Sequence, residues 1–291
     1  NALIGRILQV FGLQISRLPN QPVKNGLLKL GDFQLATDNR ELIRSYRDHP
    51  LTNRVITRVV SALCADAPEM TMIDVGANCG DSAALAKIAH DLPILCIEPD
   101  PHVFAFLKQN IAAFREIQAV QQYLGESSAT TLVQTNDGTQ LDLKTLDEVS
   151  LEWSGRARLG FLKCDTEGFD VRILHGARQL LSDCQPVILF EYNRETMSAG
   201  GEDGLRVFQY LQGLDYGPVL FYDAYGRFLA AADLKQHDLM LDFHDYAEAL
   251  MGKVLYYDVL VFPRRSELKA AAFIASERQF RRAFTQNASR A

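Results

Sequence analysis

Short apolar runs alternate with segments of helical spacing along most of this chain, beginning near residue 70. The apolar runs predict strands at residues 72–75, 94–97, 117–123, 159–165, 186–191, 218–222 and 253–262. Helices are predicted between them at residues 81–90, 101–111, 169–182 and 203–213. This alternation favours a mostly parallel sheet with right-handed crossovers and with helices on both faces.

The segments outside this alternation predict smaller elements. These are an amphipathic helix at 1–18, a strand at 33–37, helices at 39–48 and 51–65, short strands at 129–134 and 139–143 around Asn136-Asp137-Gly138, a short helix from Thr145, a mobile loop at 194–204, an insertion at 233–251 and a charged helix at 266–284. We divide the chain into an N-terminal helical extension or cap (1–69), an α/β domain (70–264) and a C-terminal helix (265–291).

Composition and charge narrow the class of protein. The chain has 291 residues, of which 47% are hydrophobic, a formal charge of −6 and a pI near 5.6. This acidic balance argues against a broad nucleic-acid-binding surface, which needs a basic face. No apolar run reaches membrane-spanning length, and the first residues lack a signal-peptide pattern, although Asn1 leaves a removed leader open. Five scattered cysteines without a C-x-x-C pair favour reduced thiols in a cytoplasmic protein.

The turn that follows the strand at 72–75 is the candidate ligand site. The sequence Asp74-Val75-Gly76-Ala77-Asn78-Cys79-Gly80 joins that strand to the helix at 81–90. A strand, a glycine turn and a helix in this order hold a ligand above the strand end. The next strand leads into Glu98, eighteen residues after Gly80, and a carboxylate there can accept both hydroxyls of a ribose. A generic turn without a ligand is the alternative interpretation.

The glycine spacing distinguishes between nucleosides. A dinucleotide fingerprint has the pattern G-x-G-x-x-G, whose middle glycine lets the backbone approach a pyrophosphate. In this chain Gly76 and Gly80 give G-x-x-x-G, and Asn78 stands where the pyrophosphate would need bare backbone. Asp74 adds negative charge, which repels an anionic ligand and suits a cation. S-adenosylmethionine has a ribose, no phosphate and a cationic sulfonium, so it fits better than NAD.

Acidic residues mark the ends of four predicted strands, namely Asp74, Glu98, Asp165 and Glu191. If the last two strands are neighbours, about 5 Å apart, Asp165 and Glu191 face each other, and crowding raises the pKa of at least one carboxyl to give a candidate general base. Alternatively, Asp165, Glu191 and Asn193 supply oxygen ligands for Mg²⁺. Glu167 either joins this group or caps the helix that follows it.

These residues together resemble the FkbM-type S-adenosylmethionine-dependent methyltransferases. The matching pieces are the turn at 74–80, Ile97-Glu98-Pro99-Asp100-Pro101, Thr145-Leu146-Asp147, Lys163-Cys164-Asp165-Thr166-Glu167-Gly168, Leu174-His175-Gly176-Ala177 and the strand with Glu191. The resemblance covers about residues 30–195 and departs at Thr166, where an aliphatic residue is usual, and at Phe169-Asp170. It implies an α/β fold with a Rossmann-like, seven-stranded, mostly parallel sheet (class I methyltransferase) whose last strand is antiparallel, with an N-terminal helical extension.

The resemblance also implies site residues and an activity. The residues implied to bind the cofactor are Asp74, Gly76, Ala77, Asn78, Gly80, Glu98, Pro99 and Glu126. Glu126 would approach the adenine, and a solvated turn acid is its equal alternative. The implied activity is O-methylation of a hydroxyl on a sugar, glycolipid or polyketide-like small molecule, with a small-molecule or glycan acceptor as partner.

Two other functions stay open at this point. A nucleotide-dependent oxidoreductase using NAD(P) is opposed by the missing middle glycine. A catalytically silent scaffold that binds S-adenosylmethionine is opposed by Asp165 and Glu191, since a binding module does not need a carboxylate pair at the acceptor position. The identity of the acceptor, the metal dependence and a homo-oligomeric state do not follow from the sequence.

Overall fold

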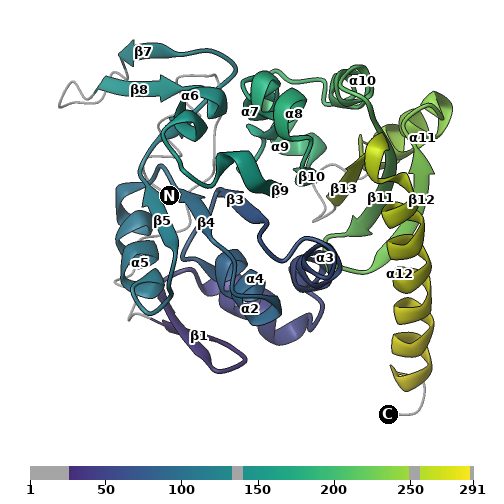
Figure 1. Ribbon diagram of the computed structural model, residues 1–291, viewed down its shortest axis with the longest axis horizontal. Helices are drawn as coiled ribbons and strands as arrows, with labels where there is room; N and C mark the ends of the chain where they lie inside the picture. The colour runs from purple at the N-terminus through teal and green to yellow at the C-terminus, as the bar shows by residue number, and fades with distance from the viewer. Residues whose placement is uncertain (1–25, 133–139, 249–255, 289–291) are drawn as a thin grey trace.

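The computed structural model describes residues 26–132, 140–248 and 256–288. Its centre is an eight-stranded sheet with the order β12-β11-β13-β10-β9-β3-β4-β5, which crosses the molecule in Figure 1. Five neighbouring strands run parallel: β3 (Thr71–Val75), β4 (Ile94–Ile97), β5 (Ile117–Val120), β9 (Leu159–Cys164) and β10 (Val187–Tyr192). The predicted α/β class with a mostly parallel sheet is therefore confirmed.

The other edge of the sheet is antiparallel. The last strand, β13 (Tyr257–Pro263), pairs antiparallel with both β10 and β11 (Tyr216–Asp223). An eighth strand, β12 (Phe228–Asp233), pairs with β11 across a tight turn and extends the expected seven-stranded sheet. Its sequence Phe-Leu-Ala-Ala-Ala-Asp has low strand propensity, so pairing with β11 rather than local preference makes it a strand.

Helices cover both faces of the sheet, because alternate residues of each strand point to opposite sides. One apolar core packs the sheet against α6 (Leu146–Leu151), α7 (Asp170–His175), α8 (Arg178–Cys184), α9 (Arg194–Ala199), α10 (Arg206–Gly213) and α11 (His237–Glu248). The other packs it against α3 (Arg54–Cys64), α4 (Asp81–Ala89), α5 (Pro101–Ile111), α12 (Glu267–Ala288) and the hairpin of β1 (Gly26–Leu30) and β2 (Phe33–Thr37). These two layers enclose the sheet in Figure 1.

Several predicted helices begin where the sequence indicates. Asp100 caps α5 by accepting hydrogen bonds from the backbone N–H groups of His102 and Val103, at 2.8 and 3.1 Å. Thr145 caps α6 in a reciprocal box with Glu148. Each cap satisfies N–H groups that a helix start otherwise leaves unpaired.

Other predicted elements differ from the structure. The helix expected at 169–182 is divided into α7 and α8 at Gly176, where a Cβ atom would lie 2.2 Å from the carbonyl oxygen of Gly125. The expected mobile loop at 194–204 contains α9, which Asn193 caps. The expected insertion at 233–251 contains α11, whose apolar side belongs to the core. Strand β1 was not expected at all.

A small second sheet rises from the region between β5 and β9. The strand expected at 117–123 ends early, and β6 (Tyr123–Leu124) leaves it to join β7 (Ala129–Leu132) and β8 (Gln140–Lys144) in the order β6-β8-β7. The turn signal Asn136-Asp137-Gly138 and the helix predicted at 1–18 lie outside the described residues.

Before α3, α2 (Arg40–Asp48) begins at Asn39, whose side chain accepts from the backbone N–H of Leu42.

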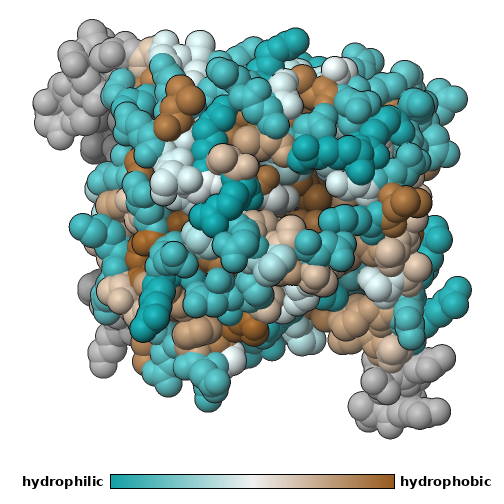
Figure 2. All heavy atoms as spheres, viewed as in Figure 1, coloured by the Kyte–Doolittle hydropathy of each residue, from teal (hydrophilic) through white to brown (hydrophobic). Residues whose placement is uncertain are grey.

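The face of the molecule in Figure 2 is mostly hydrophilic, with apolar side chains interspersed. Among residues 26–132, 140–248 and 256–288, no helix is both long and apolar enough to cross a membrane.

Candidate functional site

A cavity of about 1470 Å³ lies at the carboxyl ends of β3, β4, β9 and β10. Open α/β sheets bind their ligands at this edge. The turn after β3, the segments after β4 and β9, and helix α2 line it. A pocket for one ligand typically measures about 300–1,000 Å³. The cavity therefore has room for a nucleoside and a second molecule.

The turn after β3 needs glycine at its first position. Gly76 has φ +72°, and a Cβ atom there would lie 1.8 Å from the carbonyl oxygen of Asp165. Asn78 is also left-handed, with φ 48°, and Gly80 has φ +90°. The turn therefore passes directly against the end of β9, and this contact brings two of the sequence motifs together.

The first three N–H groups of this turn are used within the protein. Those of Gly76 and Ala77 donate to the carbonyl oxygen of Ile97 at 2.9 and 3.1 Å, and that of Asn78 donates to Glu98 Oε2 at 3.0 Å. A pyrophosphate would need such groups to be free. The arrangement therefore favours a nucleoside without phosphates, as the glycine spacing predicts.

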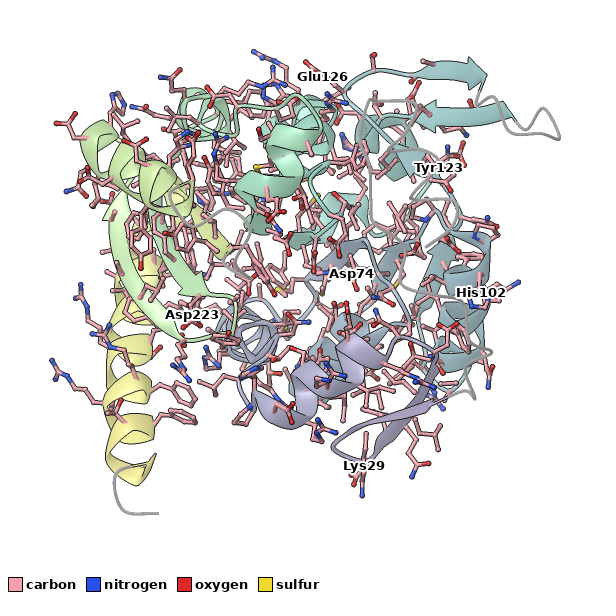
Figure 3. All side chains as sticks on the ribbon, turned by 180° about the vertical axis from the view of Figure 1, so that it is seen from behind. Lys29, Asp74, His102, Tyr123, Glu126 and Asp223 are labelled. Carbon is pink, nitrogen blue, oxygen red and sulfur yellow. The ribbon has the colours of Figure 1, made fainter. Side chains whose placement is uncertain are left out.

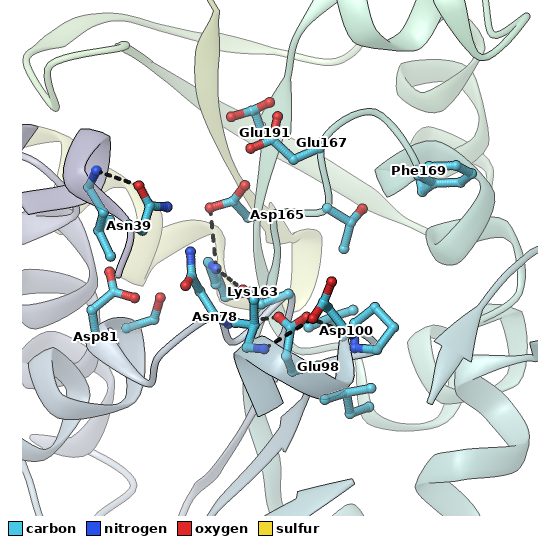
Figure 4. Close-up of a pocket in the computed structure, with 18 of the residues that line it drawn as sticks. Asn39, Asn78, Asp81, Glu98, Asp100, Lys163, Asp165, Glu167, Phe169 and Glu191 are labelled. Atoms are coloured by element: carbon cyan, nitrogen blue, oxygen red, sulfur yellow. Dashed lines mark hydrogen bonds and ion pairs between the residues drawn. The ribbon is translucent and has the colours of Figure 1, made fainter. Parts of the chain in front are cut away.

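Glu98 is the best-defined acceptor group in this half of the cavity. Its side chain is 6% exposed, and its second oxygen, Oε1, accepts from the backbone N–H of Asp100 at 3.0 Å. Each carboxylate oxygen thus has one backbone donor and retains capacity for a ligand hydroxyl. Burial raises the pKa of Glu98, while the N–H groups of Asp100 and Asn78 lower it. Figure 4 shows Glu98 beside Asn78 and Asp100.

Lys163, which the sequence pattern did not single out as a site residue, links the two halves of the cavity. Its Nζ atom lies 3.3 Å from Asp165 Oδ2 and 3.4 Å from Asp74 Oδ1, and it donates to the carbonyl oxygen of Gly76 at 3.2 Å (Figure 4). Burial lowers the pKa of Lys163, but attraction from Asp165, Asp74 and Asp81 holds it well above its usual value. Lys163 is therefore a buried cation in contact with Asp165.

The structure brings Asp165 and Glu191 together, because β9 and β10 are adjacent parallel strands. Cys164 is in register with Phe190, so Asp165 and Glu191 are the next residues along the two strands. Burial, followed by repulsion from Asp165 and from other acids, raises the pKa of Glu191 well above its usual value. Both residues line the cavity, as predicted for a carboxylate pair.

Glu167 belongs to this group, and its alternative interpretation as a helix cap is wrong. Helix α7 begins after Phe169 without a hydrogen bond from a capping side chain, and Asp170 Oδ2 accepts from the hydroxyl and N–H of Thr166 and from the N–H of Gly168 in the turn before the helix. Glu167 has a left-handed backbone, with φ 55°, and lines the cavity. Desolvation, then repulsion from Asp165 and Glu41, raises the pKa of Glu167 to about 6.

Three of the predicted cofactor residues do not reach the cavity surface. Asp74 and Ala77 are 0% exposed, and Gly80 starts α4 behind the turn. Figure 3 shows Asp74 in the middle of the molecule. Burial raises the pKa of Asp74 to about 6 although Lys163 is close. These residues support the turn from behind, whereas Gly76, Asn78, Glu98 and Pro99 line the cavity.

Glu126 also lines the cavity and keeps both of its interpretations. Its side chain is 51% exposed and lies 3.6 Å from Arg206 Nη2. Glu126 follows β6 on the way to β7, and Figure 3 places it near the rim of the molecule. The close approach of Gly176 to Gly125 fixes the backbone beside it.

The predicted metal-ligand set is not assembled. The Asn193 side-chain oxygen accepts from the N–H groups of Glu195 and Thr196 at the start of α9, and Asn193 does not line the cavity. Among the residues that the structure describes, the acids and histidines spaced closely enough to hold a metal ion are His244, Asp245 and Glu248 on α11, outside the cavity. The candidate set Asp165, Glu191 and Asn193 therefore loses its third member to a helix cap.

Asp258 is a further acid of the cavity that the sequence pattern did not indicate. It stands directly opposite Glu191 in the antiparallel pair of β10 and β13, and it lines the cavity. Burial and repulsion from Asp165 raise the pKa of Asp258 to about 8. Because β13 runs antiparallel, its first residues, rather than its last, reach the binding edge of the sheet.

A hydrogen-bonded network holds α2 and α3 beside the cavity. The Tyr46 hydroxyl donates to Asp81 Oδ2 at 2.7 Å, and the Asn53 amide donates to both of them. Asp81 is the first residue of α4, where a carboxylate interacts favourably with the helix dipole. The network therefore ties the N-terminal segment to the helix that follows the glycine turn.

The fold and the cavity define a class of protein. The strand order β5-β4-β3-β9-β10, followed by antiparallel β13 beside β11, is the Rossmann-like, mostly parallel arrangement that the family resemblance implies. Residues 74–218 match the family model described as the methyltransferase FkbM domain. Residues 74–218 therefore form an FkbM methyltransferase domain.

The solved structures that match this chain include three methyltransferases. The FkbM methyltransferase from Methylobacillus flagellatus KT is 22% identical, with a TM-score of 0.40, over 55% of this chain and 44% of its own. The precorrin-6y C5,15-methyltransferase from Geobacter metallireducens GS-15 is 13% identical, with a TM-score of 0.41, over 72% of this chain and 87% of its own. The METTL16 methyltransferase domain is 14% identical, with a TM-score of 0.44, over 90% of this chain and 78% of its own. This chain thus spans less than half of the Methylobacillus protein. No curated protein matches it.

Replacing Gly76 with alanine is expected to destabilise the protein by about 3 kcal/mol or more. A left-handed residue with a Cβ costs about 1–2 kcal/mol, and the clash with the Asp165 carbonyl adds to it. Urea denaturation measures the loss. Gly201→Ala is the matched control, because Gly201 has φ +74° and nothing within 4 Å of a Cβ. Equal losses in the two variants would contradict the close contact.

Replacing Asp258 with asparagine is expected to flatten the fall of stability between pH 5 and pH 8. A carboxyl whose pKa is about 8 when folded keeps its proton over a range in which the unfolded chain has already lost it, so stability declines as the pH rises from the ordinary aspartate pKa toward 8 and levels off above it. Removing this contribution should make the decline smaller by about 1 kcal/mol per pH unit. Urea midpoints across this range test it, with the exposed Asp245→Asn as control. Parallel curves for wild type and Asp258→Asn would refute it.

Proposed function

We propose that this protein transfers a methyl group from S-adenosylmethionine to a hydroxyl of a small-molecule or glycan acceptor. The observation that carries the proposal is the position of Glu98, a buried carboxylate that lines the cavity beside a turn whose first three N–H groups are already used. Such a site accepts two ribose hydroxyls and offers little to a phosphate.

The residues present fit this cofactor. Glu98 would hold the ribose, and Gly76 and Asn78 would lie beside the methionine part. Glu126, after β6, would approach the adenine. Asp74, Ala77 and Gly80 would act indirectly, by fixing the turn. When bound, S-adenosylmethionine supplies an activated methyl group on its sulfonium, so the protein mainly aligns the acceptor and removes its proton.

Asp165 is the proposed general base for the acceptor hydroxyl. Its side chain is 35% exposed, at the junction between the cofactor turn and the acid group formed by Glu167, Glu191 and Asp258. Lys163 Nζ forms an ion pair with Asp165 Oδ2 at 3.3 Å and so holds this side chain in place. Glu191, held next to Asp165, would orient the acceptor or take the proton in its place. Removal of a proton by a positioned side chain typically contributes about 10²–10⁴-fold to a rate.

A methyl-transfer assay tests the proposal directly. Labelled S-adenosylmethionine is incubated with sugars, glycolipids and hydroxylated small molecules, with Mg²⁺ and with EDTA, and calorimetry measures the binding of S-adenosylhomocysteine. Binding and label transfer to an oxygen are expected, and the EDTA arm decides the metal alternative. No heat with S-adenosylhomocysteine would refute the cofactor assignment. Binding without transfer to any acceptor would favour a silent scaffold, and binding of NAD(P) instead would favour an oxidoreductase.

A further inference from the structure

We propose that the acceptor carries a protonated amino group close to the hydroxyl that receives the methyl group. This inference rests on the proposed function and names the class of its substrate. It starts from the second half of the cavity, where four acids converge from different elements. Asp165 and Glu167 follow β9, Glu191 belongs to β10, and Asp258 belongs to β13.

Glu191 is the group that most clearly lacks a partner. Its side chain lines the cavity, yet the residue is only 8% exposed. Its Oε1 atom is buried, and no described residue provides a hydrogen bond to it. A buried carboxylate oxygen without a hydrogen-bond partner costs more folding free energy than a buried neutral polar group without one. A donor from a ligand would remove this cost, and a charged N–H donor would do so best.

The strand pairing adds a second observation. Glu191 and Asp258 are directly opposite in the register of β10 and β13, and both line the cavity. Like charges in directly opposed positions of an antiparallel pair are destabilising. Ionising both acids would therefore cost stability, and an ammonium group between them would favour the ionised pair by attraction.

Among the described residues, the cations near the cavity pair with Asp165 but form no ion pair with Glu167, Glu191 or Asp258. Lys163 lies beneath Asp165 and also contacts Asp74. Arg172 forms an ion pair with Glu202, at 2.9 Å. Arg44 is exposed on α2, where its charge acts on Asp48. Glu41, also on α2, adds further negative charge that acts on Glu167. The acceptor half therefore repels carboxylated and phosphorylated molecules and attracts cations.

An organic amine suits this arrangement better than a metal ion does. The acids of the cavity are not among the described residues whose ligand atoms lie within 4.8 Å of one another in groups of three. A metal ion needs its ligands at that spacing, whereas an amine on a larger molecule can reach carboxylates that are further apart. The Tyr256 ring lines the same part of the wall, and aromatic faces attract ammonium groups.

The test compares ligands that differ in charge. Calorimetry in the presence of saturating S-adenosylhomocysteine measures the binding of glucosamine, glucose, N-acetylglucosamine, glucuronate, ethanolamine, ethylene glycol and Mg²⁺. We expect each amine to bind at least tenfold more tightly than its neutral counterpart and glucuronate not to bind. Glu191→Gln and Asp258→Asn should each reduce the preference, whereas Glu69→Gln, an exposed acid paired with Arg158, should keep it.

The outcomes separate this inference from the proposed function. If S-adenosylhomocysteine binds and label transfer occurs, but no amine binds more tightly than its neutral counterpart, the amino-group inference alone fails. Tight binding of Mg²⁺ that abolishes the preference would assign the acids to a metal instead. If the substituted proteins do not fold, the comparison of glucosamine with glucose and N-acetylglucosamine in the wild type still decides the question.

Discussion

Replacing Glu98 with glutamine should weaken the binding of S-adenosylhomocysteine by about 100-fold. The substitution keeps the shape of the side chain but places an NH₂ group against the N–H of Asn78 or Asp100, which now meet a donor instead of an acceptor. It also removes the charge from hydrogen bonds to the ribose, each of which contributes about 1.5–3 kcal/mol.

Calorimetry with the wild type, Glu98→Gln and the exposed-acid control Glu152→Gln measures this effect. The control should bind the ligand as the wild type does, since Glu152 lies outside the large cavity. Thermal unfolding without ligand should show a folded Glu98→Gln protein. An affinity within threefold of the wild type would remove Glu98 from the cofactor site and, with it, the main support for the proposed cofactor.

Replacing Asp165 with asparagine should lower the rate of methyl transfer by about 10²–10⁴-fold while leaving the affinity for S-adenosylhomocysteine within a few-fold. Asparagine cannot take the proton from the acceptor hydroxyl, and it deprives Lys163 of one of its two carboxylate partners. The cofactor side of the cavity, in contrast, keeps Glu98 and the turn after β3.

Single-turnover assays with saturating cofactor separate the chemical step from product release. Asp183→Asn, an exposed acid paired with Arg156, is the matched control and should retain the wild-type rate. A wild-type rate in Asp165→Asn would exclude Asp165 as the base. The same assay on Glu191→Gln would then show whether the neighbouring carboxylate has that role.

Local sequence patterns were sufficient for the parallel half of the sheet. The strand with Asp74, the glycine turn and the capped helix after Asp100 are each specified by residues close in sequence, and the structure contains all three. The end of each parallel strand also reaches the same edge of the sheet. For this reason Glu98, Asp165 and Glu191 could be assigned to one cavity before any coordinates were known.

Features that depend on distant contacts did not follow from the sequence. Strand β12 exists because β11 pairs with it, and its alanine-rich sequence gives little indication of a strand. Asp258 reaches the cavity at the start of an antiparallel strand, whereas the acids predicted from the sequence stand at the ends of strands. Asn193 has the right chemistry for a metal ligand, but the start of α9 uses its side-chain oxygen. Lys163 becomes informative only when Asp74 is seen beside it.

The contact between Gly76 and the Asp165 carbonyl has a practical consequence for engineering this protein. Through this contact and through Lys163, the turn that lines the proposed cofactor site is joined directly to Asp165, the proposed base. A redesign that moves the backbone of residues 163–168 to fit a new acceptor would therefore disturb the proposed cofactor site at the same time. Helix α2 and the start of β13 also line the cavity and lie outside residues 163–168. They therefore offer positions at which acceptor selectivity can be changed with less effect on the proposed cofactor site.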